Sequence, residues 1–152
     1  MARTERDDRE QIVGALAVAT DRIALATASL GLAYEQLDET TADRLEAELF
    51  RPVQRALARA KRANSGFAQR FGLDAPAGVE TSPGAPSQGA KGLVENAVAA
   101  LAEASRDLAE LQDTMLPIEV GDAELRAGLT EVRELVDAAP PRAREFLRTL
   151  GR

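Results

Sequence analysis

The sequence predicts an all-α protein, an up-down four-helix bundle with a short C-terminal helix, and three observations lead to this prediction. Apolar residues make up 45% of the 152-residue chain but aromatic residues only 3%. Alanine dominates the apolar class, which favours closely packed helices over strands. Apolar residues also recur at alternating spacings of four and three, as on the buried face of a helix. At this length we expect one helical domain, residues 1–152, with a substantial core.

The first helix is expected from about residue 5 to residue 37. Thr4, with Asp7 three residues later, resembles a capping box at its start. Its apolar seam consists of Ile12, Leu16, Ala19, Ile23, Ala26, Leu30, Ala33 and Leu37. A second apolar row on another side consists of Val18, Leu25 and Leu32. A helix with two apolar sides is central or holds a second partner, so this row is a candidate partner-binding surface.

The second helix is expected to start at a cap provided by Thr40 or Thr41. Its seam consists of Leu45, Leu49, Val53, Ala56, Ala60, Ala63 and Phe67. Pro52 lies inside this pattern and should kink or restart the helix near Phe50. Gly72 should end it. Residues 4–73 would then form a first helical hairpin.

Residues 74–90 are rich in proline, glycine and serine and are predicted to be a linker. The third helix follows, and Pro117 should end it; its seam is Val94, Ala97, Leu101, Ala104, Leu108, Leu111 and Met115. Asp122 is the expected N-cap of a shorter fourth helix with the seam Leu125, Leu129, Val132 and Val136. Pro140 and Pro141 should break that helix and leave a short C-terminal helix. Residues 91–152 form the second predicted hairpin.

The two predicted hairpins resemble each other in sequence. At one constant offset, Val13, Leu16, Ala19 and Ile23 align with Val98, Leu101, Ala104 and Leu108. With a shift, Phe67 and Gly72 align with Phe146 and Gly151. Two explanations stay open: a duplicated hairpin in tandem, or the general similarity of alanine-rich heptad helices. Two hairpins packed face to face would make a four-helix bundle, with the two phenylalanines as plugs near the ends of the second and fourth helices.

Several chemistries are excluded because the chain contains no histidine and no cysteine. Serine or cysteine nucleophiles activated by histidine, histidine-ligated zinc and Glu-x-x-His di-iron sites all need these residues. We therefore predict no catalytic, cofactor-binding or metal-binding residue, and no enzyme. Glu103, Asp107 and Glu110 lie at helical spacing, which is typical of a solvated face. They leave open the alternative of a small carboxylate-based enzyme or ligand-binding bundle.

Basic residues gather in one segment of an otherwise acidic chain. The formal net charge is -6, which disfavours nucleic acid as a partner. No acidic residue occurs between Glu48 and Asp74. Within that stretch lie Arg51, Arg55, Arg59 and Arg62, whose spacings of 4, 4 and 3 place them on one helix face. This arginine stripe either docks an acidic partner or pairs with acids of the same bundle or of a dimer, namely Glu103, Asp107, Glu110 or those of the first helix.

The sequence predicts a cytoplasmic protein that is not inserted in a membrane. Residues 1–10 are charged and lack the apolar stretch of a secretory leader. Residues 12–34 approach the length of a membrane span, but Asp21 and Arg22 lie at their middle, where each charge costs roughly 2.5 to 3.5 kcal/mol. The absence of cysteine is compatible with the cytoplasm. Leaderless secretion stays open as an alternative.

Residues 34–38 read Tyr-Glu-Gln-Leu-Asp and place Tyr34 and Asp38 in a Y-x-x-x-D spacing. This spacing is similar to the tyrosine-acid signal of helical hairpins exported by type VII secretion systems. In its alanine-rich periodic helices the chain also resembles small bacterial hairpin domains found beside secreted toxins. It departs from the exported hairpins in having no Trp-x-Gly turn and in placing the motif at the end of the first helix. The resemblance implies a secretion-associated hairpin protein.

Taken together, these patterns favour a non-catalytic protein that binds other proteins, as an interaction module or adaptor. The expected partner is a helical or acidic protein, or a second copy of the chain in a homodimer. Coiled-coil-like packing of alanine-rich seams would provide the contact, and the arginine stripe would select the partner by charge. The alternatives are the secretion-associated hairpin protein and the carboxylate-based enzyme or ligand-binding bundle.

Overall fold

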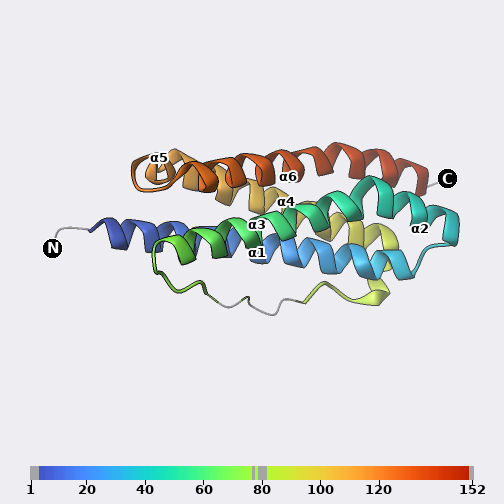
Figure 1. Ribbon diagram of the computed structural model, residues 1–152. Helices are drawn as coiled ribbons and strands as arrows, with labels where there is room; N and C mark the ends of the chain where they lie inside the picture. Colours follow the sequence, from blue (N-terminus) through green and yellow to red (C-terminus); the bar gives the residue numbers. More distant parts are fainter. Residues whose placement is uncertain (1–3, 77, 79–81, 151–152) are drawn as a thin grey trace.

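A computed structural model describes residues 4–76, 78 and 82–150 (Figure 1). Its elements are α1 (Glu5–Glu35), α2 (Glu39–Leu45), a π-helical turn (Glu46–Phe50), α3 (Arg51–Arg70), a 3₁₀ turn (Pro86–Gln88), α4 (Gly89–Asp113), α5 (Leu116–Glu119) and α6 (Ala123–Leu150). These ranges contain no strand. The prediction of an all-α helical bundle is confirmed.

The four long helices lie side by side, and each packs against two others (Figure 1). α1 contacts α3 and α4, and α6 contacts the same two helices. α3 ends and α4 begins toward opposite ends of the bundle (Figure 1). Each hairpin is therefore up-down, but α3 and α4 run in the same direction, so the order is up, down, down, up. Every pair of neighbouring long helices is antiparallel.

The predicted seams form the core. Leu16, Ile23 and Leu30 of α1 are at most 1% exposed, and Leu101 and Leu108 of α4 are nearly as completely buried. The predicted seam positions are buried except at two helix ends, where Leu37 is half-buried and Met115 is exposed. Because the seams were defined by helical spacing alone, their burial shows that the periodicity identified the core faces correctly.

Two buried phenylalanines lie at opposite ends of the bundle. Phe67 is near the end of α3 and Phe146 near the end of α6, both are fully buried, and the two helices are antiparallel. Phe67 also packs against the ring of Phe71, with 4.9 Å between ring centroids. Above Phe71 lies the guanidinium of Arg9, 4.2 Å from the ring centroid. Both phenylalanines thus lie near the helix ends where the sequence predicted plugs; a gene duplication remains a prediction.

Gly72 ends α3 as predicted. Its φ of 64° is in the left-handed region, which glycine adopts at no steric cost. The N–H of Leu73 donates to the carbonyl of Ala68 at 2.8 Å, and the N–H of Gly72 donates to that of Gln69 at 3.3 Å. These two bonds are those of a Schellman motif. The matching stop predicted at Gly151 lies outside the described residues.

The helix starts agree with the sequence at two of three places. Thr4 and Asp7 form the predicted capping box of α1. Asp122 accepts a hydrogen bond from the N–H of Leu125 at 2.8 Å and caps α6. The cap predicted at Thr40 or Thr41 is wrong, because the carboxylate of Asp38 accepts the N–H of Thr41 at 2.7 Å. A carboxylate also interacts favourably with the helix dipole, and the bond from Thr41 lowers the pKa of Asp38.

The two proline-containing segments behave differently. Near Pro52 the chain forms the π-helical turn Glu46–Phe50 and restarts as α3 at Arg51, which confirms the predicted restart. The predicted break at Pro140 and Pro141 is wrong, because α6 continues through both. These prolines lack the N–H groups that would bond the carbonyls four residues earlier. Burial of Ala143 and Phe146 against the bundle offsets that loss, so there is no separate C-terminal helix.

Length and mean hydropathy alone would allow α1 to cross a membrane, a property it shares with signal sequences and with core helices of soluble proteins. In this structure α1 packs against α3 and α4 and contributes fully buried side chains to the core. At its middle, Arg22 pairs with two carboxylates of α4. The helix therefore lies in the bundle as a core helix.

One ion-pair cluster joins the end of α3 to the start of α6. Arg70 donates to both carboxylate oxygens of Asp122, at 2.6 and 2.9 Å, and pairs with Glu124 at 2.8 Å. The hydrogen bond from Arg70 is the main cause that lowers the pKa of Asp122 and raises that of Arg70. Asp122 therefore both caps α6 and clamps it to α3.

We expect this clamp to make stability sensitive to acid. A carboxyl group whose pKa is lower in the folded state stabilises the fold above its unfolded pKa of about 3.9, and that contribution disappears as the pH falls through the folded pKa. Asp122→Asn keeps a capping side chain but removes this titration. Urea unfolding measured from about pH 2.5 to about pH 6, a range on both sides of the ordinary aspartate pKa of about 3.9, should show a shallower loss of stability in the variant as the pH falls. Asp43→Asn, at an exposed site, should keep the wild-type slope; equal slopes for Asp122→Asn and wild type would contradict the clamp.

Candidate partner-binding groove

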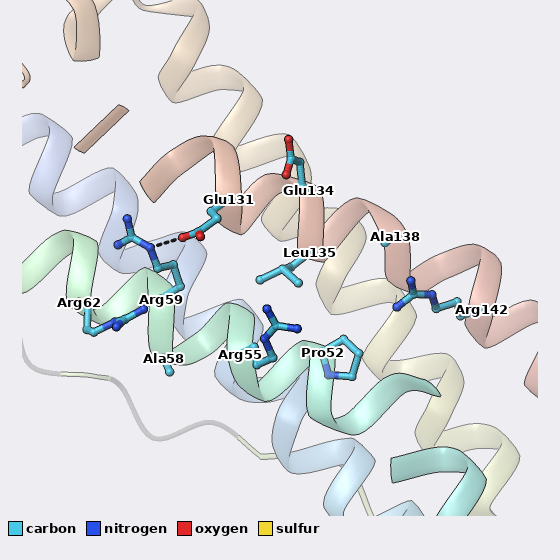
Figure 2. Close-up of a pocket in the computed structure, with 10 residues that line it drawn as sticks. All are labelled: Pro52, Arg55, Ala58, Arg59, Arg62, Glu131, Glu134, Leu135, Ala138 and Arg142. Atoms are coloured by element: carbon cyan, nitrogen blue, oxygen red, sulfur yellow. Dashed lines mark hydrogen bonds and ion pairs between the residues drawn. The ribbon is translucent and has the colours of Figure 1, made fainter. Parts of the chain in front are cut away.

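Three of the four arginines of the stripe line a groove between α3 and α6, which has a volume of about 690 Å³. Figure 2 shows side chains from both helices around it. Its lining consists of Pro52, Arg55, Ala58, Arg59 and Arg62 from α3, and Glu131, Glu134, Leu135, Ala138 and Arg142 from α6. The groove thus combines a small apolar surface with four arginines and two glutamates.

Local sequence explains the α3 wall. The residues of α3 that face the core are small or apolar, among them Ala56, Ala60 and Phe67. Their helical spacing turns the arginines toward the side that meets α6. Because α3 contains no acidic residue, no carboxylate on this helix neutralises the stripe.

Arg59 is held in place at the centre of the groove. Its side chain is only 22% exposed, and its Nε donates to Glu131 of α6, the pair marked by the dashed line in Figure 2. Gly128 of α6 makes room for it: a Cβ there would lie 3.2 Å from Nη1 of Arg59 and 2.8 Å from the Cβ of Ala63. The glycine therefore permits the close approach of α3 and α6 at this level.

Three other arginines of the groove form no ion pair with the described residues. Arg55 and Arg62 of α3 and Arg142 of α6 are exposed, and none of them forms an ion pair with any residue in the described part of the chain. Arg142 was missed in the sequence because it follows two prolines on a segment that was expected to be separate. The fourth predicted stripe residue, Arg51, pairs with Glu46 at 3.6 Å and does not line the groove.

The internal partners proposed for the stripe are elsewhere. Glu103 and Asp107 each bind Arg22 of α1 at 2.5 Å, and the hydrogen bond with Asp107 is the main cause that raises the pKa of Arg22. Within one bundle the stripe therefore does not pair with these two acids; pairing across a dimer remains a prediction. The stripe forms one ion pair with another long helix in the described residues, between Arg59 and Glu131 of α6. Residue spacing within a single helix could not indicate that Glu131 would face the stripe.

The second apolar row is divided between core and surface. Val18 is 48% exposed, whereas Leu25 and Leu32 are half-buried and pack against the core. Leu25 also lines a shallow hollow beside Pro83 of the linker, and the hydroxyl of Ser29 donates to the carbonyl of Pro83 at 2.5 Å. Leu25 and Leu32 thus already pack within the bundle and are only partly available to a partner. A partner for this row remains a prediction.

The remaining candidate residues have local structural contacts. Tyr34 packs edge-on against Phe50, with 6.3 Å between ring centroids, and Asp38 caps α2. In the described ranges, no three acidic side chains lie close enough together to hold a metal ion. The absence of catalytic, cofactor and metal sites remains a prediction.

Fold and groove together define the chain as a four-helix bundle with a basic groove on an acidic molecule. Comparison with known proteins adds no relative: no family model, curated protein or solved structure matches the chain. The resemblance to type VII or toxin-associated hairpins therefore rests on residues 34–38 and on the periodicity of the helices.

Proposed function

We propose that this chain is a non-catalytic adaptor, cytoplasmic in location, that binds an acidic helical segment of a partner protein in the groove between α3 and α6. One observation carries the proposal. Arg55, Arg62 and Arg142 line one groove from two facing helices without a carboxylate partner among the described residues, although the whole chain has a net charge of -6. The guanidinium fork matches carboxylates geometrically, so acidic side chains suit these positions.

A helix is the partner shape that fits the groove best. Arg55 and Arg62 are two turns apart, about 10 Å along the axis of α3. Carboxylates one or two turns apart on one face of a partner helix are separated by the same distances as the arginines along α3. Ala58 and Ala138 also line the groove, and their short side chains leave room for small apolar side chains of a partner to pack. Nucleic acid is disfavoured because the groove has no aromatic residue on which bases could stack.

The proposal is tested with a fluorescent synthetic helical peptide that carries glutamates at spacings of four and three between alanines and leucines. Fluorescence anisotropy should show binding that weakens as salt is added, since exposed charges are screened. Arg55→Glu combined with Arg142→Glu should weaken it by about tenfold or more, because facing like charges repel. Circular dichroism would verify that the variant is folded.

Two controls separate the groove from general electrostatics. Arg106 of α4 is also exposed but lies outside the groove. Arg106→Glu should therefore weaken binding much less, for each reversed charge, than Arg55→Glu combined with Arg142→Glu. A peptide of identical composition in scrambled order should bind more weakly than the helical one. The proposal is wrong if the peptide does not bind at low salt, or if reversal at Arg106 has the same effect per charge as reversal in the groove.

A further inference from the structure

The two side chains of the ion pair at the centre of the groove, Arg59 and Glu131, differ in how far they are buried. The Arg59 side chain is 22% exposed and lies against Gly128, whereas the Glu131 side chain is 59% exposed. Only Nε of Arg59 donates to Glu131, and neither Nη group has an acceptor among the described residues. Water reaches this pair from the Glu131 side, and ion pairs that water screens contribute little to stability. Glu131 can therefore leave the pair at little cost while Arg59 stays in position.

We propose that Glu131 occupies, in the free protein, the place that a partner carboxylate takes on Arg59. This inference rests on the proposed function of the groove and adds its regulation. Binding then exchanges one carboxylate for another, and the groove of the free protein is partly blocked by its own side chain. The partner thereby contacts three successive stripe positions, Arg55, Arg59 and Arg62, which requires acids at the same spacings of four and three.

Glu134 provides a matched comparison because it lines the same groove. Unlike Glu131, it has no ion pair with any residue that the structure describes. Glu131→Gln and Glu134→Gln change the net charge equally, so the long-range repulsion between the negatively charged protein and an acidic peptide falls equally in both. Only Glu131→Gln also removes the negative charge that competes for Arg59, because the glutamine amide can still accept a hydrogen bond but forms no ion pair. A difference between the two variants therefore measures the exchange at Arg59 separately from the overall charge.

The test measures the dissociation constant of the same glutamate peptide by anisotropy for both variants. We expect Glu131→Gln to bind about two- to fivefold more tightly than Glu134→Gln, the range expected for loss of a competing exposed ion pair. In an Arg59→Gln background this difference should disappear. Circular dichroism of each variant controls for folding, and Glu131→Ala is the second variant if Glu131→Gln is unstable.

The outcomes distinguish this inference from the proposed function. If wild type binds and is weakened by reversal of Arg55 and Arg142, but Glu131→Gln and Glu134→Gln bind equally, only the exchange at Arg59 is overturned. A difference that persists without Arg59 also overturns it. If none of the proteins binds the peptide at low salt, the proposed function and this inference are overturned together.

Discussion

Replacing Phe67 with alanine should lower the free energy of unfolding by about 3 to 5 kcal/mol. The ring is fully buried near the end of α3, so its removal loses both its transfer free energy and its packing contacts. Urea unfolding followed by circular dichroism measures the change. Phe146→Ala, at the opposite end of the bundle, should cost a similar amount because its ring is equally buried.

Phe71→Ala is the control for this prediction. Phe71 is half-buried and its ring lies under Arg9, so its removal should cost less, about 1 to 2 kcal/mol. The two substitutions delete the same side chain from neighbouring turns and differ mainly in burial. Equal losses at Phe67 and Phe71 would contradict the position of Phe67 as a core plug.

Separating the two hairpins should have the other large effect. Expressed alone, residues 1–73 should not show a cooperative monomeric melt, whereas a domain of this kind is expected to be stable by about 5 to 15 kcal/mol. In the intact protein α1 packs along α4, and its buried leucines would face water without that helix. Alanine seams bury little area per residue, so the remaining contacts with α3 cannot offset the loss.

The fragments also provide the control. Mixing residues 1–73 with residues 82–152 in equal amounts should restore helix content and a cooperative melt, because the interface between the halves needs no covalent link. Circular dichroism and sedimentation would follow both properties. If residues 1–73 formed a monomer as stable as the whole chain, the interdependence of the hairpins would be wrong.

Features that depend on neighbours in sequence were predicted well. Helical periodicity identified the buried seams, and the short-range chemistry of Thr4, Gly72 and Asp122 identified three helix boundaries. These signals act within a few residues, so they are visible in the chain itself. The stripe on α3 was found for the same reason, since its arginines share one helix face.

Features that depend on tertiary packing were missed. The continuity of α6 through Pro140 is maintained by buried residues beyond it, which overrides the local tendency of proline to end a helix. The α6 wall of the groove depends on the register between α3 and α6, because Arg59 and Glu131 lie 72 positions apart. Residue spacing within one helix gives no information on how two helices are aligned, so Glu131 and Arg142 could not be identified as groove residues from the sequence.

The distance in sequence between the two walls has a consequence during protein synthesis. A ribosome releases α3 well before α6, since Arg59 precedes Glu131 by 72 positions. The stripe then emerges as an isolated row of cations, without Gly128 to seat Arg59 or Arg142 to complete the groove. A nascent chain therefore carries only the α3 wall of the groove, and binding of the partner proposed above would require that translation has passed α6.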